Sequence, residues 1–131
     1  MVYSNLIVSS ADSDASLSAA AGVTEPVAIP TTKTTVGEAV DVFDFTLTDG
    51  GAGDSLALEV SQLVINVSGT SSQAQRGNLT WRLNGPDASN VTGSYAAGGG
   101  SAGTLTFSGL SISVADGSSE VYTLNAYYND N

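Results

Sequence analysis

The 131-residue chain has no histidine, no cysteine and only three basic residues, against thirteen Asp and Glu. Without His and Cys, the sequence excludes Ser-His-Asp and Cys-His catalytic sites and zinc sites built on nitrogen or sulfur ligands. Three cations in a chain of net charge -10 are too few to bind the phosphates of nucleic acid. No apolar run approaches the roughly 18 residues of a membrane-spanning helix. We therefore expect no enzyme activity, no nucleic-acid partner and no membrane insertion.

The residues that are abundant favour an all-β protein. The chain is 41% hydrophobic, which is enough for a core, and its length suits one domain. Helix-forming residues are scarce, whereas Gly, Ser, Thr and Val are common. Apolar and polar residues alternate along residues 43–47, 79–83 and 110–114, and turn sequences separate these segments. This pattern predicts an immunoglobulin-like antiparallel β-sandwich of about seven to nine strands.

The chain divides near residue 36. Residues 1–35 are predicted to form extended N-terminal strands, and residues 36–131 the core of the sandwich, within one domain overall. Pro26 and Pro30 mark residues 23–36 as an edge strand or an extended crossing segment, because proline cannot donate to a β-ladder. A slip in the alternation near residues 61–62 predicts a bulge or bend. Residues 110–114 and 121–128, joined by Asp-Gly, are predicted to form a hairpin.

One loop has the composition of a calcium site. The sequence of residues 49–54 is Asp-Gly-Gly-Ala-Gly-Asp, which places the carboxylates of Asp49 and Asp54 on a glycine-rich turn. Calcium needs six to eight oxygen ligands, so backbone carbonyls or another aspartate would have to contribute. Candidates from neighbouring loops are Asp44, Asp87 and Asp116. The alternative is a solvated turn in which Gly adopts positive φ values and Asp caps the backbone.

Aromatic residues offer a second kind of site, a platform on which sugar rings stack. Trp81 is in phase with two leucines, so we expect it in the core. Consecutive tyrosines on a strand point to opposite faces, so at most one of Tyr127 and Tyr128 can join a flat platform. The candidates for a glycan platform are Trp81, Tyr95, Tyr122, Tyr127 and Tyr128.

Four segments carry a resemblance to a known type of module. They are residues 42–56 (VFDFTLTDGGAGDSL), 63–67 (LVINV), 107–110 (FSGL) and 112–124 (ISVADGSSEVYTL). Together they resemble a recurrent immunoglobulin-like module of very large bacterial extracellular proteins, such as repeat-rich surface adhesins and hemagglutinin-like proteins. The resemblance covers about residues 36–131. It implies an extracellular or cell-surface location, a structural or adhesive role, and partners that are neighbouring modules or copies of the chain. It supplies no catalytic residues.

The resemblance also predicts how copies of the chain join. Such modules would continue after residues 127–131 into another apolar strand. Either the given boundary cuts the module short, or a sheet edge is left open for a strand from another subunit. Residues 1–35 are the predicted donor, and head-to-tail exchange of this kind would build a fibre. The sequence thus predicts a non-enzymatic structural module of a surface adhesin or fibre. The alternative is a module that binds a glycan or a cell-surface partner.

Overall fold

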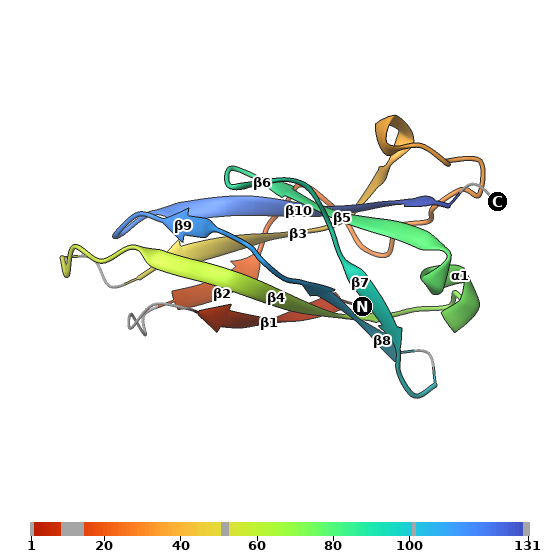
Figure 1. Cartoon of the computed structure of the whole chain (residues 1–131), viewed down its shortest axis with the longest axis horizontal. Helices are drawn as coiled ribbons and strands as arrows, with labels where there is room; N and C mark the ends of the chain where they lie inside the picture. Colours follow the sequence, from red (N-terminus) through yellow and green to blue (C-terminus); the bar gives the residue numbers. More distant parts are fainter. Residues whose placement is uncertain (1, 9–14, 51–52, 101, 130–131) are drawn as a thin grey trace.

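The fold is a sandwich of two antiparallel sheets, whose strands run along the long axis of the molecule (Figure 1). The computed structural model describes residues 2–8, 15–50, 53–100 and 102–129. In this part of the chain, sheet A contains β1 (Val2–Val8), β4 (Leu58–Ser68), β7 (Ser94–Ala97), β8 (Ala102–Phe107) and β9 (Ile112–Val114). Sheet B contains β2 (Ala15–Ala19), β3 (Val40–Asp49), β5 (Leu79–Gly85), β6 (Ala88–Thr92) and β10 (Ser119–Tyr128). The predicted β-sandwich is confirmed.

The strand count depends on how β8 and β9 are treated. β8 pairs with residues 63–68 of β4, and β9 pairs with residues 58–60 of the same strand. Because β1 pairs with β4 over residues 60–67, it occupies the other side of that strand. β8 and β9 therefore form one interrupted strand beside β4. Sheet A is four strands wide and sheet B five, which gives nine strand positions within the described residues.

The core lies between the inward faces of the two sheets. Alternate residues of β10, β5 and β8 are buried, as the predicted period of two requires. Trp81 is buried, as predicted. Three fully buried aromatic and aliphatic side chains from different strands, Phe45, Tyr122 and Leu105, illustrate how both sheets contribute to one cluster.

The predicted irregularity near residues 61–62 is confirmed as a bulge in β4. Leu58 and Val60 are buried on one side of it, and the buried set resumes at Leu63, so the alternation shifts by one residue. The pairing with β1 shifts at the same place, between Ile7 and Val8. Ser61 is the extra residue, and its carbonyl oxygen accepts a hydrogen bond of 2.9 Å from the backbone N–H of Leu110. The bulge thus contacts the interruption between β8 and β9.

The predicted hairpin between residues 110–114 and 121–128 is wrong. Both segments contain strands, β9 and β10, but β9 pairs with β4 in sheet A and β10 pairs with β3 and β5 in sheet B. The turn at Asp116-Gly117 therefore carries the chain from one sheet to the other. The predicted alternation of buried and outward residues along each strand is confirmed. Alternation cannot distinguish a hairpin from a crossover, because both place one apolar face of each strand toward the same core.

The expected open edge beside the last strand is also absent. β10 lies inside sheet B, between β3 and β5. An immunoglobulin domain has strands A-B-E-D in one sheet and C-F-G in the other. Here β1-β4-β8-β7 follows the first order, and β5-β10 corresponds to the C-F pair. The position of strand G, beside strand F, is taken by β3, which pairs with β10. Because β3 precedes β4 in the sequence, this chain covers the outer side of β10 with an earlier strand of its own.

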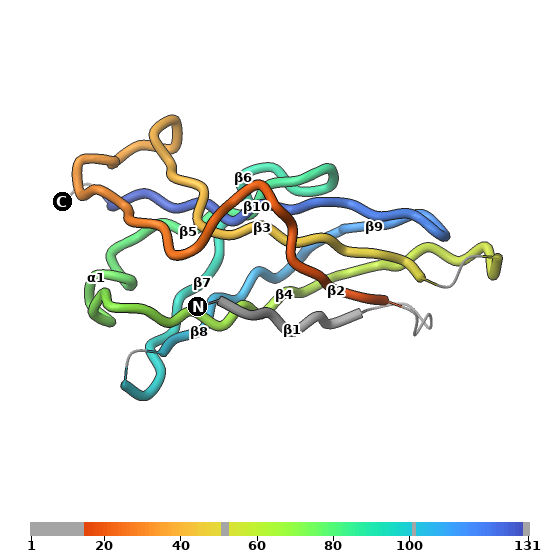
Figure 2. Tube along the Cα trace, turned by 180° about the vertical axis from the view of Figure 1, so that it is seen from behind, coloured from red at the N-terminus to blue at the C-terminus, as the bar shows by residue number. Residues whose placement is uncertain are grey.

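Residues 20–39 link β2 to β3 as a crossing segment, one of the two predicted alternatives. Figure 2 shows this segment leaving β2 and looping around the end of the sandwich that carries the short helix α1 (Gln73–Gly77) and the C-terminus. It contains a single turn of 3-10 helix, η1 (Val36–Glu38). The backbone N–H of Tyr128 donates to the carbonyl of Lys33 at 2.7 Å, which ties the segment to the end of β10.

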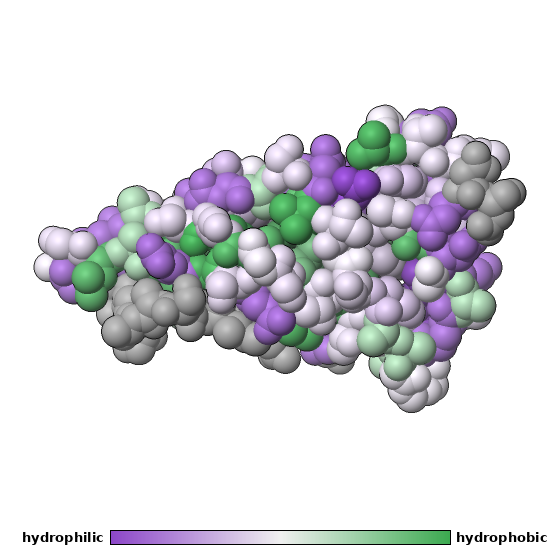
Figure 3. Space-filling model, in the orientation of Figure 1, coloured by the Kyte–Doolittle hydropathy of each residue, from purple (hydrophilic) through white to green (hydrophobic). Residues whose placement is uncertain are grey.

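The surface has no extended apolar face in the view of Figure 3, where hydrophobic residues form small, separate areas among polar ones. Among the described residues, no helix has the length and apolar character needed to cross a membrane.

Candidate functional site

The end of the sandwich that holds α1 has two adjoining hollows, which share Gln75 and Tyr128 as lining residues. α1 was not predicted from the sequence. It begins with a capping box: the hydroxyl of Ser72 accepts from the N–H of Gln75 at 3.1 Å, and the side chain of Gln75 accepts from the N–H of Ser72 at 2.9 Å. The Ser-x-x-Gln spacing of residues 72–75 is the signal that could have revealed this helix.

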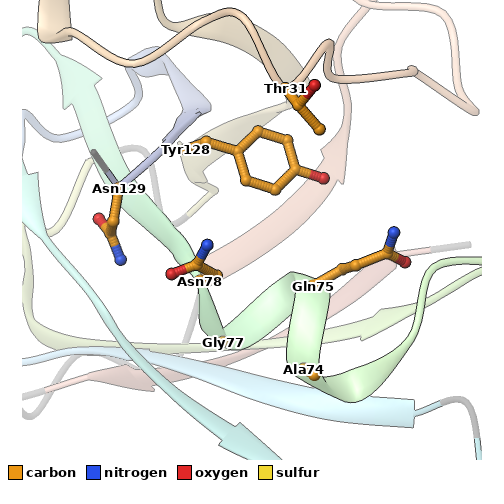
Figure 4. A pocket seen from close by; sticks show the side chains of 7 residues that line it. All are labelled: Thr31, Ala74, Gln75, Gly77, Asn78, Tyr128 and Asn129. Atoms are coloured by element: carbon orange, nitrogen blue, oxygen red, sulfur yellow. The ribbon is translucent and has the colours of Figure 1, made fainter. Parts of the chain in front are cut away.

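The first hollow, which we call the amide pocket, is shallow and has a volume of about 580 Å³. Figure 4 shows the ring of Tyr128 between Thr31 on one side and the side chains of Gln75 and Asn78 on the other. The side-chain oxygen of Asn129 accepts a hydrogen bond from the hydroxyl of Thr80, and the N–H of Asn129 donates to the carbonyl of Asn78 at 2.9 Å. The lining residues are Thr31, Ala74, Gln75, Gly77, Asn78, Tyr128 and Asn129.

The second hollow, which we call the core cavity, has a volume of about 390 Å³ and opens into the interior between the two sheets. Residues 25–29 of the crossing segment form one wall, and the end of β4 with residues 69–71 forms another. The inner walls come from β3, β5 and β10. Core side chains that line the cavity are Val42, Val67, Leu79, Trp81 and Leu124.

A polar network around Arg76 borders the core cavity. Arg76 is only 2% exposed, although it is one of the three basic residues in the chain. Its Nε donates to the hydroxyl of Tyr95 at 2.9 Å, and its Nη1 donates to the hydroxyl of Ser71 at 3.2 Å. Trp81 donates from its indole nitrogen to the carbonyl of Arg76 at 3.0 Å and stacks on Tyr95, with the ring centroids 6.3 Å apart. These contacts hold the guanidinium in place.

The aromatic candidates do not form one platform. Trp81 and Tyr122 are buried, and Tyr95 packs against Trp81. Tyr127 lies outside the core, with the Arg82 guanidinium 5.9 Å from its ring centroid and donating to its hydroxyl at 3.2 Å. Tyr128 lines both hollows at the α1 end, and Trp81 lines the core cavity. The prediction that Tyr127 and Tyr128 do not act together agrees with this placement.

The predicted calcium loop lies at the opposite end of the molecule, between β3 and β4 (Figure 1). Asp49 is buried at the end of β3, and its N–H donates to the carbonyl of Ser118 at 3.0 Å. Asp54 is exposed, and its carboxylate accepts from the N–H of Leu56 at 2.8 Å. Residues 51–52 of the loop lie outside the described residues.

Of the three aspartates named as possible helpers, Asp116 alone contacts this loop. Its carboxylate accepts from the N–H groups of Gly53 at 3.2 Å and Ser55 at 3.0 Å. Asp44 instead accepts from Gly22, and Asp87 accepts from Ser113. In the part of the chain that is described, no three Asp, Glu, His or Cys side chains gather in a group that could hold a metal ion. Calcium binding at Asp49 and Asp54 stays a prediction.

Comparisons of the chain with protein-family models, with curated proteins and with solved structures found no match.

Proposed function

We propose that the chain is a non-enzymatic structural module of a bacterial extracellular or cell-surface protein, and that copies of it join by exchange of strand β1. The extracellular assignment follows from the resemblance of residues 36–131 to modules of large surface proteins. The exchange mechanism is supported by one structural observation: β1 lies at an open edge of sheet A, where its pairing partner is β4.

Exchange of an edge strand between copies costs little free energy, because the same pairing is formed again. The ladder between β1 and β4 pairs Val2 with Val67 at one end and Val8 with Val60 at the other. A second copy has the same β1 sequence, so it can form the same ladder on β4 without a new interface. Where the exchange is head-to-tail and the rotation between successive copies does not close, repeated exchange builds a fibre, whereas reciprocal exchange between two copies gives a closed dimer. The donor would be part of residues 1–35, as the sequence predicts.

A disulfide trap on the full-length chain tests the proposal. Tyr3 and Asn66 are paired across β1 and β4, and the chain has no native cysteine, so Tyr3→Cys with Asn66→Cys introduces one possible bridge. Oxidation at high protein concentration should give a ladder of covalent multimers on a non-reducing gel if β1 is exchanged. The matched control is Ser94→Cys with Thr106→Cys, a pair across β7 and β8 at the other edge of the same sheet.

The control pair should give a single monomer band at every concentration, since β7 and β8 follow each other directly in the chain. A monomer band for the Tyr3–Asn66 pair at all concentrations would contradict exchange. The chain would then be a spacer that contacts neighbouring modules without sharing strands. Negative-stain images of the wild-type protein at the same concentrations show whether the multimers are filaments.

A second candidate function, glycan binding, is favoured by the amide pocket. Sugar hydroxyls pair with amide side chains, and sugar rings stack on aromatic rings. Tyr128 supplies a half-buried ring, with Gln75, Asn78 and Asn129 beside it. On an oligosaccharide array, Tyr128→Ala should lose the binding that the wild-type chain shows. Tyr127→Ala, which alters the adjacent ring on the outer face of sheet B, should retain it. Absence of wild-type binding, or equal loss in both variants, contradicts a glycan site in the amide pocket.

A further inference from the structure

We propose that the amide pocket selects sugars that carry an N-acetyl group, such as N-acetylglucosamine. This inference rests on the second candidate function, glycan binding, and names the class of sugar that the pocket would take. Its evidence is the direction in which the amide side chains of Gln75 and Asn129 face, together with their uncharged surroundings. Strand exchange does not enter, because it involves β1 and β4 at an edge of sheet A.

The orientation of the two amide groups is fixed by hydrogen bonds to their oxygens. The N–H of Ser72 donates to the side-chain oxygen of Gln75 at 2.9 Å, and a backbone N–H can only donate, so the oxygen of this amide must face it. The hydroxyl of Thr80 donates to the side-chain oxygen of Asn129. Neither NH2 group donates to any of the described residues. Gln75 and Asn129 therefore offer the pocket mainly hydrogen-bond donors.

The acceptor that suits these donors is uncharged. Every described residue that lines the amide pocket is neutral, so none of them would balance the charge of a carboxylate or a sulfate. The chain as a whole carries a net charge of -10, which repels anionic ligands such as sialic or uronic acids. A carbonyl oxygen accepts from amide NH2 groups without carrying a charge. In neutral sugars, the group that supplies such an oxygen is the N-acetyl group.

The remaining groups of the pocket match the rest of an N-acetylated sugar. Tyr128 supplies a half-buried ring for one face of the sugar and a hydroxyl that can accept from the acetamido N–H. Ala74 and Thr31 add methyl groups for the acetyl methyl to contact, and Figure 4 shows Thr31 and Gln75 on opposite sides of the Tyr128 ring. The volume of about 580 Å³ falls in the range of small-molecule sites, roughly 300–1,000 Å³. A hydroxyl in place of the acetamido group offers neither the carbonyl nor the methyl.

The test compares chitohexaose with cellohexaose on the full-length protein by isothermal titration calorimetry. The two oligosaccharides share the same linkage and ring stereochemistry, and they differ in an acetamido group that replaces one hydroxyl on each ring. We expect chitohexaose to bind about tenfold more tightly, because one further hydrogen bond and one buried methyl group each add a modest free energy. Tyr128→Ala should lose binding of both, since it removes the ring on which the sugar stacks.

Gln75→Glu removes a donor of the pocket and keeps the capping oxygen. One carboxylate oxygen can still accept from the N–H of Ser72, and a negative charge in the first turn of a helix is favourable, so the variant should fold. The second oxygen replaces the NH2 group, and the preference for chitohexaose should disappear. Gln62→Glu on β4, which makes the same change of charge outside the pocket, should retain the preference.

NMR signals of side-chain NH2 groups locate the ligand directly. On addition of chitohexaose, the signals of Gln75 and Asn129 should shift, and that of Gln62 should not. Shifts at Gln62 without shifts at Gln75 would place the sugar elsewhere and overturn the inference. If Gln75→Glu does not fold, Asn129→Asp decides, because it keeps an oxygen for the hydroxyl of Thr80 and removes the other donor.

Calorimetry separates selection of the N-acetyl group from glycan binding itself. Cellohexaose that binds as tightly as chitohexaose, with both lost in Tyr128→Ala, would leave a glycan site in the amide pocket but overturn selection of the N-acetyl group. No binding of either oligosaccharide at millimolar concentration would overturn the glycan function and this inference together. An equal loss of preference in Gln75→Glu and Gln62→Glu would assign the preference to net charge and overturn the role of the Gln75 donor. None of these results bears on strand exchange, which the disulfide trap tests separately.

Discussion

At the scale of single residues, glycines are placed where aromatic rings lie across the sheet. A Cβ atom added at Gly85 would lie 2.5 Å and 2.8 Å from ring carbons of Tyr122, and one at Gly93 would lie 2.7 Å from ring carbons of Phe107. Gly103 is covered in the same way by Tyr95. In the sequence these glycines read as turn residues or strand breakers. Their role depends on which ring crosses them, and the strand pairing decides that.

We predict that Gly85→Ala destabilises the protein by about 1–3 kcal/mol, because the added methyl group must displace the ring of a fully buried tyrosine. Urea unfolding followed by circular dichroism measures the loss. The matched variant is Gly37→Ala in η1, where an added Cβ would have no atom within 4 Å apart from the adjoining backbone. Equal stability of the two variants would show that Tyr122 moves aside without cost.

Tyr122 also makes stability depend on pH. Burial, together with the hydrogen bond of its hydroxyl to Glu120 at 2.6 Å and the negative charge of that residue, raises the pKa of Tyr122 well above its ordinary value. An unfolded tyrosine ionises near pH 10, roughly. Above that pH the unfolded chain releases this proton while the folded protein keeps it, so folding loses stability as pH rises; below it the contribution is fully present.

We therefore predict that the free energy of unfolding falls above about pH 10, by up to about 1.4 kcal/mol per pH unit from this residue. In Tyr122→Phe this part of the decline should vanish, although the variant starts from a lower stability because it loses the bonds to Glu120 and Asp87. Tyr127→Phe, altered on the outer face of sheet B, should keep the decline. Urea unfolding of the wild-type protein and both variants, measured between about pH 8 and about pH 11, gives the decline of the free energy of unfolding in each. A decline of equal slope in Tyr122→Phe and the wild-type protein would contradict the assignment.

At the scale of elements, α1 connects the two sheets at the end that holds both hollows. The side chain of Gln73 donates to the carbonyl of Gly100 at 2.9 Å and accepts from the hydroxyl of Tyr95, so the helix also holds the turn between β7 and β8. A five-residue helix has little stability of its own, so its cap and these tertiary contacts maintain it.

We predict that Ser72→Ala lowers stability by about 1 kcal/mol, since it leaves the N–H of Gln75 without the capping hydroxyl. The exposed Ser89 on β6 provides the matched control, and Ser89→Ala should change the free energy of unfolding by less than about 0.5 kcal/mol. Thermal and urea unfolding of both variants supply the values. A loss as large for Ser89→Ala as for Ser72→Ala would mean that the cap contributes nothing specific.

The elements also show how far alternation can predict structure. It located β3, β5 and β10 and the bulge at Ser61, because burial of one face imposes a period of two and a bulge interrupts it. It did not show that β9 and β10 belong to different sheets, since a crossover and a hairpin bury the same faces. It also gave no sign of α1, where the signal is the Ser72 capping box rather than a repeated apolar pattern.

At the scale of the whole molecule, the two ends have different characters. One end carries the loop between β3 and β4, and the other carries α1 and the crossing segment (Figure 1). Both hollows lie at this second end, because residues of α1 line each of them. The aspartates at the first end already accept backbone hydrogen bonds: Asp54 from Leu56, and Asp116 from Gly53 and Ser55. A calcium ion would have to share or replace these contacts.

The remaining calcium prediction concerns the stability of the whole fold, because an ion that binds the folded state alone stabilises it by mass action. Calcium at about 100 times its dissociation constant should raise stability by about 2.7 kcal/mol, and hence raise the Tm by several degrees relative to EDTA. Asp54→Asn should lose the rise, and Asp87→Asn, whose carboxylate instead accepts from Ser113, should keep it. Identical melting of the wild-type protein in calcium and in EDTA would contradict a calcium site.

The sequence by itself determined the all-β class and the buried position of Trp81, because these follow from composition and from a local period of two. Only the tertiary structure decided that β3 takes the place of the last strand, that the turn at Asp116 crosses between sheets, and that Arg76 borders a cavity in the core. These features join segments far apart in the chain. Local alternation carries no information about which distant partner a strand or a charged side chain will meet.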